Sequence, residues 1–395
     1  MKLGYILMLD KSGSMTGAID QVKLNAQVFV GCSRENDQFG VCGFSDNAIW
    51  VYPEGQAPNI VTVSPSAIEI TAANKNIQGI TLGNLTNIGD AIRIGNIMIG
   101  KATTDLKAFV MLSDGDHNTG THPRDVLGNQ PPLFVAGLGY YLDERYFTEL
   151  IKKNKDSRYY PIPTSFEMMQ IFNDIIGESN KSPVLMNSLN EMPSGVGYNV
   201  NSFDVSRESN ELSVNVVWDN QRYKYVTGYL QKNTFRPLLI DPDNRQTQYQ
   251  PYFVGDGFCV YRLKNLKPGK WKLWTEYSID NRAYCTFGCV NYASDLKPMI
   301  NAPPTVTVGE NIKLSVQMYD GKAKLTNAFV RAHIEKPTIS LNSALKKYEQ
   351  ELRKITGIGL EDVSSSDIIT KGRNIIMIFF ISIFFITHAL PVIFL

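Results

Sequence analysis

The sequence predicts an α/β protein built on a doubly wound parallel sheet, followed by an antiparallel β domain. Two continuous apolar runs, 5–9 and 108–112, predict strands that are buried on both faces, as in a parallel sheet covered by helices. Apolar residues at helical spacing after such runs predict the covering helices. Beyond residue 181, apolar and polar residues alternate, which is typical of antiparallel strands. A chain of 395 residues has room for two or three domains.

Strands and helices alternate throughout residues 1–178, which we predict to form the first domain. Residues 54–78 are rich in Pro, Ser and Asn and predict a loop with at most one short helix. The other elements that we expect after the first strand are a helix over 19–30, strand 39–44, a helix from Ile88, strand 108–112, strand 133–138, a helix near 147–151, strand 158–162 and a helix over 168–175.

Polar side chains occupy three turns of this predicted sheet. Asp10, Ser12 and Ser14 follow the first strand, Thr86 precedes a predicted helix, and Asp114 follows the strand 108–112. Because the carboxyl ends of parallel strands meet at one edge of a sheet, we expect these side chains to converge. Carboxylate and hydroxyl oxygens suit a hard cation such as Mg²⁺ or Mn²⁺. The first turn alone would also fit a simple helix N-cap, so the prediction depends on all three segments.

The pattern Asp-x-Ser-x-Ser, a distant Thr before a helix, and a strand ending in Ser-Asp-Gly resembles the metal ion-dependent adhesion site of von Willebrand factor type A domains. All five positions are present, and the resemblance covers residues 1–178. It implies that both aspartates act largely through water and that one coordination position stays open for an Asp or Glu of a partner protein. His117 and His122 lie in the adjoining loop, where we expect exposed polar residues rather than metal ligands.

Residues 185–298 predict a β-sandwich of short strands separated by turns such as 241–244 and 267–270. Over 211–218, one set of alternate residues is apolar and the other polar, so we expect half-exposed strands. The apolar set is Leu212, Val214, Val216 and Trp218. The order of strands and turns is similar to the β domain that follows the A domain in the calcium-activated chloride channel regulator family.

The C-terminal third predicts three further segments. Residues 302–337 alternate like an immunoglobulin-like unit but are too few for a complete one, so this unit either pairs with the second domain or departs from that plan. A helical linker is expected over 340–372. Residues 374–395 carry no Asp, Glu, Lys or Arg. At about 1.5 Å per residue they would cross a bilayer core of about 30 Å, although a buried terminal helix is the alternative.

Charge around this last segment predicts its orientation. Lys371 and Arg373 before it would keep the preceding domains on the cytoplasmic side, giving a membrane protein anchored by its C-terminus. No cleavable signal peptide is recognisable, because the first apolar run belongs to the sheet. If the true start of the chain were missing, these domains would instead be extracellular.

Composition and motifs narrow the class of function. A net charge of +1 predicts no nucleic-acid partner. Cys259, Cys285 and Cys289 lack the further ligands of a zinc site, and whether any two form a disulfide depends on the compartment, with reduced thiols favoured. No nucleophile elbow, zinc-protease helix or phosphate loop is present, so we predict no enzyme. The predicted function is a divalent-cation-dependent protein-binding or adhesion module; the alternatives are a metal-independent scaffold of a membrane-associated assembly and a metal-dependent hydrolase.

Overall fold

The computed structural model describes residues 1–115, 117–128, 130–138, 147, 150–151, 156–162, 167–205, 211–247, 249–292, 296–301, 315–320 and 323–324. The chain divides into two units, 1–328 and 329–394, and every described residue belongs to the first. The predicted linker over 340–372 and the predicted transmembrane segment over 374–395 therefore lie outside the described residues. Within the described part, no helix is long and apolar enough to cross a membrane.

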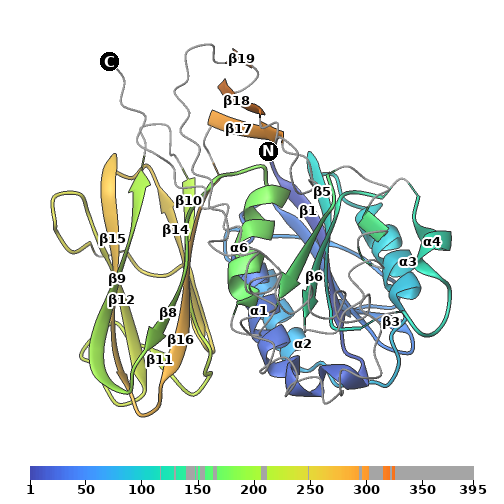
Figure 1. Ribbon diagram of the computed structural model, residues 1–395, viewed down its shortest axis with the longest axis horizontal. Coiled ribbons are helices and arrows are strands. Elements are labelled where there is room, and N and C mark those ends of the chain that lie inside the picture. The colour runs from blue at the N-terminus through green and yellow to red at the C-terminus, as the bar shows by residue number, and fades with distance from the viewer. Residues whose placement is uncertain are drawn as a thin grey trace, which may run out of the picture. The chain divides into compact units, whose positions relative to one another are not determined.

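A mixed sheet lies at the start of the chain; its centre is parallel, as predicted, whereas its antiparallel edge was not predicted (Figure 1). Its strand order is β3-β2-β1-β5-β6-β7, and β4 pairs with β2. The strands β2, β1, β5, β6 and β7 are parallel, whereas β3 and β4 run antiparallel to β2 at the edge. Their bounds are β1 Leu3–Asp10, β2 Gln38–Phe44, β3 Ala48–Tyr52, β4 Val61–Thr62, β5 Leu106–Ser113, β6 Leu133–Leu138 and β7 Arg158–Ile162.

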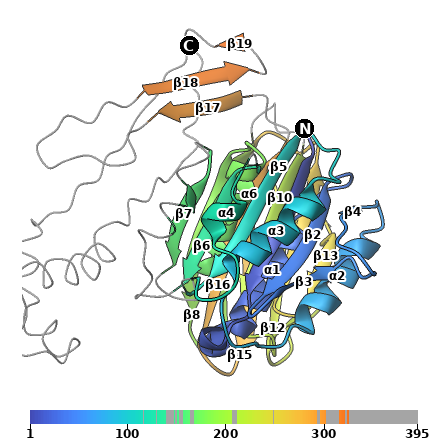
Figure 2. The same ribbon diagram turned by 90° about the vertical axis from the view of Figure 1, so that its right-hand side faces the viewer.

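Helices cover both faces of this sheet because alternate residues of β1 point to opposite cores. Tyr5 and Leu7 pack in one core with residues of α1, α2 and α6, while Ile6 and Met8 pack in the other with residues of α3. The ribbon shows helices on both faces of the sheet (Figures 1 and 2). The helical bounds are η1 Gly13–Gly17, α1 Ile19–Gly31, α2 Ile68–Gln78, α3 Ile88–Ile99, α4 Pro123–Val126 and α6 Met168–Ser179. Helices thus cover both faces of the sheet, as in a doubly wound fold.

Two sheets follow and enclose one further core. The first has the order β13-β14-β10-β16-β8 and the second β11-β12-β15-β9. All neighbours are antiparallel except β11 and β12. Trp218 of the first sheet stacks on Phe235 of the second, with ring centroids 4.9 Å apart. The bounds are β8 Val184–Met192, β9 Gly195–Val205, β10 Glu211–Trp218, β11 Lys224–Tyr225, β12 Thr234–Ile240, β13 Phe253–Gly255, β14 Phe258–Lys264, β15 Gly269–Ile279 and β16 Ala283–Asn291.

The prediction that β10 is half-exposed is wrong, because helices of the first domain cover its polar face. Ser213 and Asn215 are fully buried, and Val217 belongs to the same core as α1 and α6. Asn215 Nδ2 donates a hydrogen bond of 2.8 Å to Asn173 Oδ1 on α6. Phe258 of β14 belongs to that core too. The first domain and the five-stranded sheet therefore share a continuous buried interface.

Three short strands follow: β17 Leu296–Asn301, β18 Ser315–Asp320 and β19 Ala323–Lys324. They form an antiparallel sheet in the order β17-β18-β19. This sheet includes parts of the predicted unit 302–337, and the rest of that unit lies outside the described residues. The domain boundaries given by the sequence stay predictions.

The cysteines pack as small apolar side chains. All five are buried and unpaired, including Cys259, Cys285 and Cys289. Burial raises the pKa of each thiol, that of Cys32 to about 11. A thiol that resists ionisation is a poor nucleophile and a poor metal ligand.

Candidate metal centre

The register of two parallel strands brings the predicted carboxylates together. Asp10 is the last residue of β1, and Asp114 directly follows the last residue of β5. These strands are neighbours, with Leu9 opposite Leu112. Ser113 completes the link, because its Oγ donates a hydrogen bond of 2.5 Å to Asp10 Oδ2. Ser113 was not among the predicted ligands, although it is the Ser of the Ser-Asp-Gly sequence that ends the strand.

The turn after β1 carries the next two oxygens. The backbone N–H of Ser12 donates to Asp10 Oδ1 at 2.8 Å, which folds the turn back over that carboxylate. The hydroxyls of Ser12 and Ser14 share a hydrogen bond of 3.0 Å. Ser14 Oγ in turn donates to Asp114 Oδ1 at 2.7 Å. Hydrogen bonds thus link four of the five predicted residues, through the Ser12 backbone N–H and the two serine hydroxyls.

Thr86 lies on the loop before α3 and faces the cluster of Asp10, Ser12, Ser14 and Asp114. A methyl group added to Gly115 would lie 3.6 Å from Thr86 Oγ1 and 3.8 Å from Ser14 Oγ, so Gly115 leaves room where the hydroxyls meet. Asn118 fixes the loop, since its Oδ1 accepts from Thr86 N at 2.8 Å and its N–H donates to Thr86 O at 3.0 Å. Sequence reasoning missed this role of Asn118, because a side chain that holds a distant loop leaves no local pattern.

The Thr86 hydroxyl itself has no hydrogen-bond partner among the described residues, and the residue is 2% exposed. Its oxygen is therefore held at the site without being occupied by another protein group. All five residues predicted from the sequence, Asp10, Ser12, Ser14, Thr86 and Asp114, meet at the carboxyl edge of the sheet.

Burial dominates the electrostatics of this cluster. It raises the pKa of Asp10 to about 6, against the opposing hydrogen bonds from Ser113 and Ser12, and nearby Asp114 adds to the rise. Burial also raises the pKa of Asp114, opposed by the Ser14 hydroxyl. In the part of the chain that is described, neither carboxylate forms an ion pair with Lys or Arg.

The donor set fits a divalent cation. Two carboxylates supply about −2, and three hydroxyls add neutral oxygens, which is the ligand chemistry of Mg²⁺ or Mn²⁺ rather than of a soft metal. A cation bound there would also relieve the cost of holding two carboxylates together away from water. Within the described residues, no group of three or more His, Cys, Asp or Glu side chains could hold a metal, so any site here depends on the hydroxyls.

The two histidines of the adjoining loop pack on each other. The rings of His117 and His122 meet edge to face with centroids 5.4 Å apart. His122 also caps α4, because its Nδ1 accepts from the N–H of Arg124 at 3.1 Å. Burial lowers the pKa of His117, and His122 adds to the lowering. Both residues are half-buried rather than exposed as expected, and their contacts are those of a structural pair.

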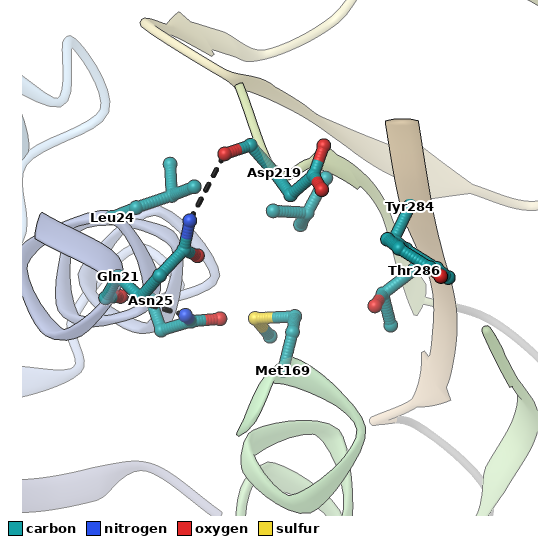
Figure 3. Close-up of a pocket in the computed structure, with 8 residues that line it drawn as sticks. Gln21, Leu24, Asn25, Met169, Asp219, Tyr284 and Thr286 are labelled. Carbon is teal, nitrogen blue, oxygen red and sulfur yellow. Dashed lines mark hydrogen bonds between the residues drawn. The ribbon is translucent and has the colours of Figure 1, made fainter. Parts of the chain in front are cut away.

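A separate small cavity lies in the domain interface, between α1, α6, β10 and β16 (Figure 3). Gln21 Nε2 donates to the backbone oxygen of Asp219 at 3.0 Å across it. Buried acceptor atoms of Asn25 and Asp219 have no partner in the described part of the chain, and a polar space of this kind is typical of ordered water. None of the five predicted metal ligands lines it. The lining residues are Gln21, Leu24, Asn25, Met169, Val217, Asp219, Tyr284 and Thr286.

Comparison with known proteins gives fold-level similarity at low identity. No protein-family model and no curated protein matches the chain. Among solved structures it is similar to a von Willebrand factor type A protein from Catenulispora acidiphila, with 14% identity and a TM-score of 0.40 over 71% of this chain. The match spans 59% of that protein's length. The resemblance of the second domain to the calcium-activated chloride channel regulator family stays a prediction.

Two further structures show similarity over less than half of the chain. Protein BatB from Bacteroides thetaiotaomicron has 17% identity and a TM-score of 0.35, covering 45% of this chain and 98% of its own. Proximal thread matrix protein 1 from the mussel byssus, in a form whose adhesion motif is occupied by zinc, has 15% identity and a TM-score of 0.37, covering 48% of this chain and 49% of its own. Identities and TM-scores this low identify no function for this chain.

Proposed function

We propose that this chain is a divalent-cation-dependent protein-interaction module. Asp10, Ser12, Ser14, Thr86 and Asp114 would hold one Mg²⁺ or Mn²⁺ at the carboxyl edge of the first sheet. The observation that carries the proposal is the series of hydrogen bonds that links Asp10 through Ser12 and Ser14 to Asp114, with the Thr86 hydroxyl, which has no partner among the described residues, facing it. We propose no catalytic step.

The charge of the site determines the class of partner. The bound cation would be neutralised by the carboxylates of buried Asp10 and half-buried Asp114, so a further anionic oxygen could join it without facing excess negative charge. An Asp or Glu side chain of a partner protein has this chemistry and would complete the coordination. The chain's own residues would bind and orient the cation. The rigid turn around Ser12 and the Asn118-held loop would set which face of the cation the partner reaches.

We further propose that residues 374–395 anchor the chain in a membrane. The support is the uncharged, Ile- and Phe-rich sequence of bilayer-spanning length. Lys371 and Arg373 support placement of the preceding domains on the cytoplasmic side. The acidic partner would then be met at that membrane surface.

Calorimetric titration of the full chain with Mn²⁺ tests the metal proposal. We expect one bound ion per chain, no binding by Asp10→Ala, and unchanged binding by Asp20→Ala, which removes an exposed carboxylate from the first turn of α1. Equal Mn²⁺ affinity in wild type and Asp10→Ala would overturn the metal site. Metal binding without any chelator-sensitive capture of acidic protein ligands would favour the scaffold alternative instead.

A further inference from the structure

The strand β9 is an unusually open edge. It pairs along its whole length with β15, from Gly195 opposite Ile279 to Val205 opposite Gly269, with no bulge. No other described strand pairs with its second edge. Along this eleven-residue strand, every second residue therefore directs its backbone N–H and C=O groups toward the second edge, where a further strand could pair.

Natural proteins protect such edges with charge, proline or a bulge, and β9 has almost none of these devices. Its sequence contains no Pro, Lys, Arg or Glu, and its one charged residue, Asp204, stands next to the last position. Three apolar side chains on its outward face are strongly exposed: Val196 by 79%, Tyr198 by 61% and Val200 by 42%. Tyr198 stacks on Trp274 of β15 with centroids 4.3 Å apart, which extends this apolar row across the sheet.

The polar side chains on the inward face of β9 already have hydrogen-bond partners within the protein, so a partner protein need not insert a side chain between the two sheets. Asn201 Oδ1 accepts from the Ser188 hydroxyl at 2.7 Å and from Asn190 Nδ2 at 3.1 Å, and Asn199 Oδ1 accepts from Asn201 Nδ2 at 2.6 Å. These bonds close the gap between β9 and β8 of the other sheet. A partner would therefore add to the backbone edge alone rather than fill a groove.

We infer that this edge pairs with the β9 edge of a second copy of the chain, in antiparallel orientation about a two-fold axis. The row of outward side chains, Val196, Tyr198 and Val200, has the same order of residue types when the strand direction is reversed. An axis at Tyr198 places Tyr198 opposite the second copy's Tyr198, and Val196 opposite the second copy's Val200. A two-fold interface requires this kind of self-complementary surface.

Charge and register support this occupant. With the axis at Tyr198, Asp204 lies outside the paired stretch, where Lys270 is its neighbour on β15. A one-residue shift in register would put the outward rows of the two strands on opposite faces of the sheet, and an axis at Val200 would place Val196 opposite Asp204. With the axis at Tyr198, the uncharged stretch from Gly195 to Asn201 pairs with itself, so no like charges lie opposite each other. One strand pair and one row of side chains fall at the low end of interface size, under about 1,200 Å², so the dimer should depend on concentration.

The test uses the full chain in EDTA, so that no metal bridge contributes. We expect a reversible dimer in sedimentation experiments, weakened at least tenfold by Val200→Lys and unchanged by Val254→Lys, a matched exposed valine on β13. Tyr198→Cys should form a disulfide-linked dimer on mild oxidation, because opposite residues in a strand pair lie within disulfide range. The native cysteines, all buried, should not interfere.

Ser202→Cys is the control for register. Ser202 lies on the same exposed row as Tyr198 but four residues from the axis, so the two introduced cysteines would be far apart. We expect at least tenfold less cross-linking from it than from Tyr198→Cys. A chain that stays monomeric up to about 0.1 mM, where even a weak edge contact associates, would overturn the inference. Equal cross-linking of the two cysteine variants would overturn it as well, because the contact would then lack the stated register.

Discussion

Replacing Thr86 by Val separates metal binding from folding. The substitution removes one oxygen and keeps the branched shape of a side chain that is 2% exposed. The Thr86 hydroxyl has no hydrogen-bond partner in the described structure, and both contacts to Asn118 use backbone or Asn118 atoms that remain. Because no hydrogen bond is lost, we expect the free energy of unfolding in EDTA to change by less than about 0.5 kcal/mol.

Mn²⁺ affinity should respond in the opposite way. If the Thr86 oxygen serves the metal site, its loss should weaken Mn²⁺ binding at least tenfold, which corresponds to about 1.4 kcal/mol. Thr86→Ser is the matched control, because it keeps the oxygen and removes the methyl group. It should bind Mn²⁺ within about threefold of wild type while losing about 1 kcal/mol of stability through the missing buried methyl.

Calorimetry with Mn²⁺ and urea unfolding in EDTA, made on the three proteins, give both quantities. The reasoning fails if Thr86→Val binds Mn²⁺ as well as wild type. It also fails if Thr86→Ser loses as much affinity as Thr86→Val, since shape rather than the oxygen would then control binding.

Three further predictions address the domain interface and the C-terminus. Gly288→Ala would place a methyl group in steric conflict with the buried, hydrogen-bonded side chain of Asn173, so the free energy of unfolding in urea should fall by about 1–3 kcal/mol. An unchanged midpoint of unfolding would refute this packing. Burial raises the pKa of Asp174 from 3.8 to about 6, so its ionisation opposes folding: the contribution of this carboxyl to stability is greatest below about pH 4 and falls by at most about 3 kcal/mol as pH rises through 6. Asp174→Asn should lessen that fall in unfolding titrations at pH 4 and 7, and an identical pH dependence would contradict it. A chain ending at Lys371 should stay in the aqueous fraction, whereas the full chain should resist carbonate extraction; aqueous full-length protein would count against the anchor.

The first sheet and its polar edge were predictable because their signals are local. Each strand that carries a ligand is a continuous apolar run, and the carboxylate or hydroxyl follows within a few residues, as Asp10 follows β1 and Asp114 follows β5. Parallel pairing then determines which loop ends meet. By contrast, the apolar run of β3 was not predicted as a strand, and α2 falls in the polar stretch 54–78, whose composition resembles a loop with one short helix at most.

Tertiary contacts account for what the sequence did not show. Ser213 and Asn215 on β10 have the polar pattern of an exposed face, and only helices from a distant part of the chain make them buried. The hairpin of β8 and β9 was missed because Asn, Ser and Gly occupy positions where a strand pattern requires apolar residues. The roles of Ser113 and Asn118 depend on loops separated by more than 30 residues, which no local spacing records.

Water-proton relaxation of Mn²⁺ bound to the full chain tests the central claim most directly, because it reports both the number of bound ions and the exchangeable water at the open coordination position. The account predicts one Mn²⁺ per chain with exchangeable bound water. Added acetate, a stand-in for a partner's carboxylate, should lower the relaxation enhancement of that Mn²⁺, and Asp10→Ala should show neither effect. Absence of bound Mn²⁺ in the wild type, or relaxation that saturating acetate leaves unchanged, would contradict the proposal that this site receives an acidic side chain.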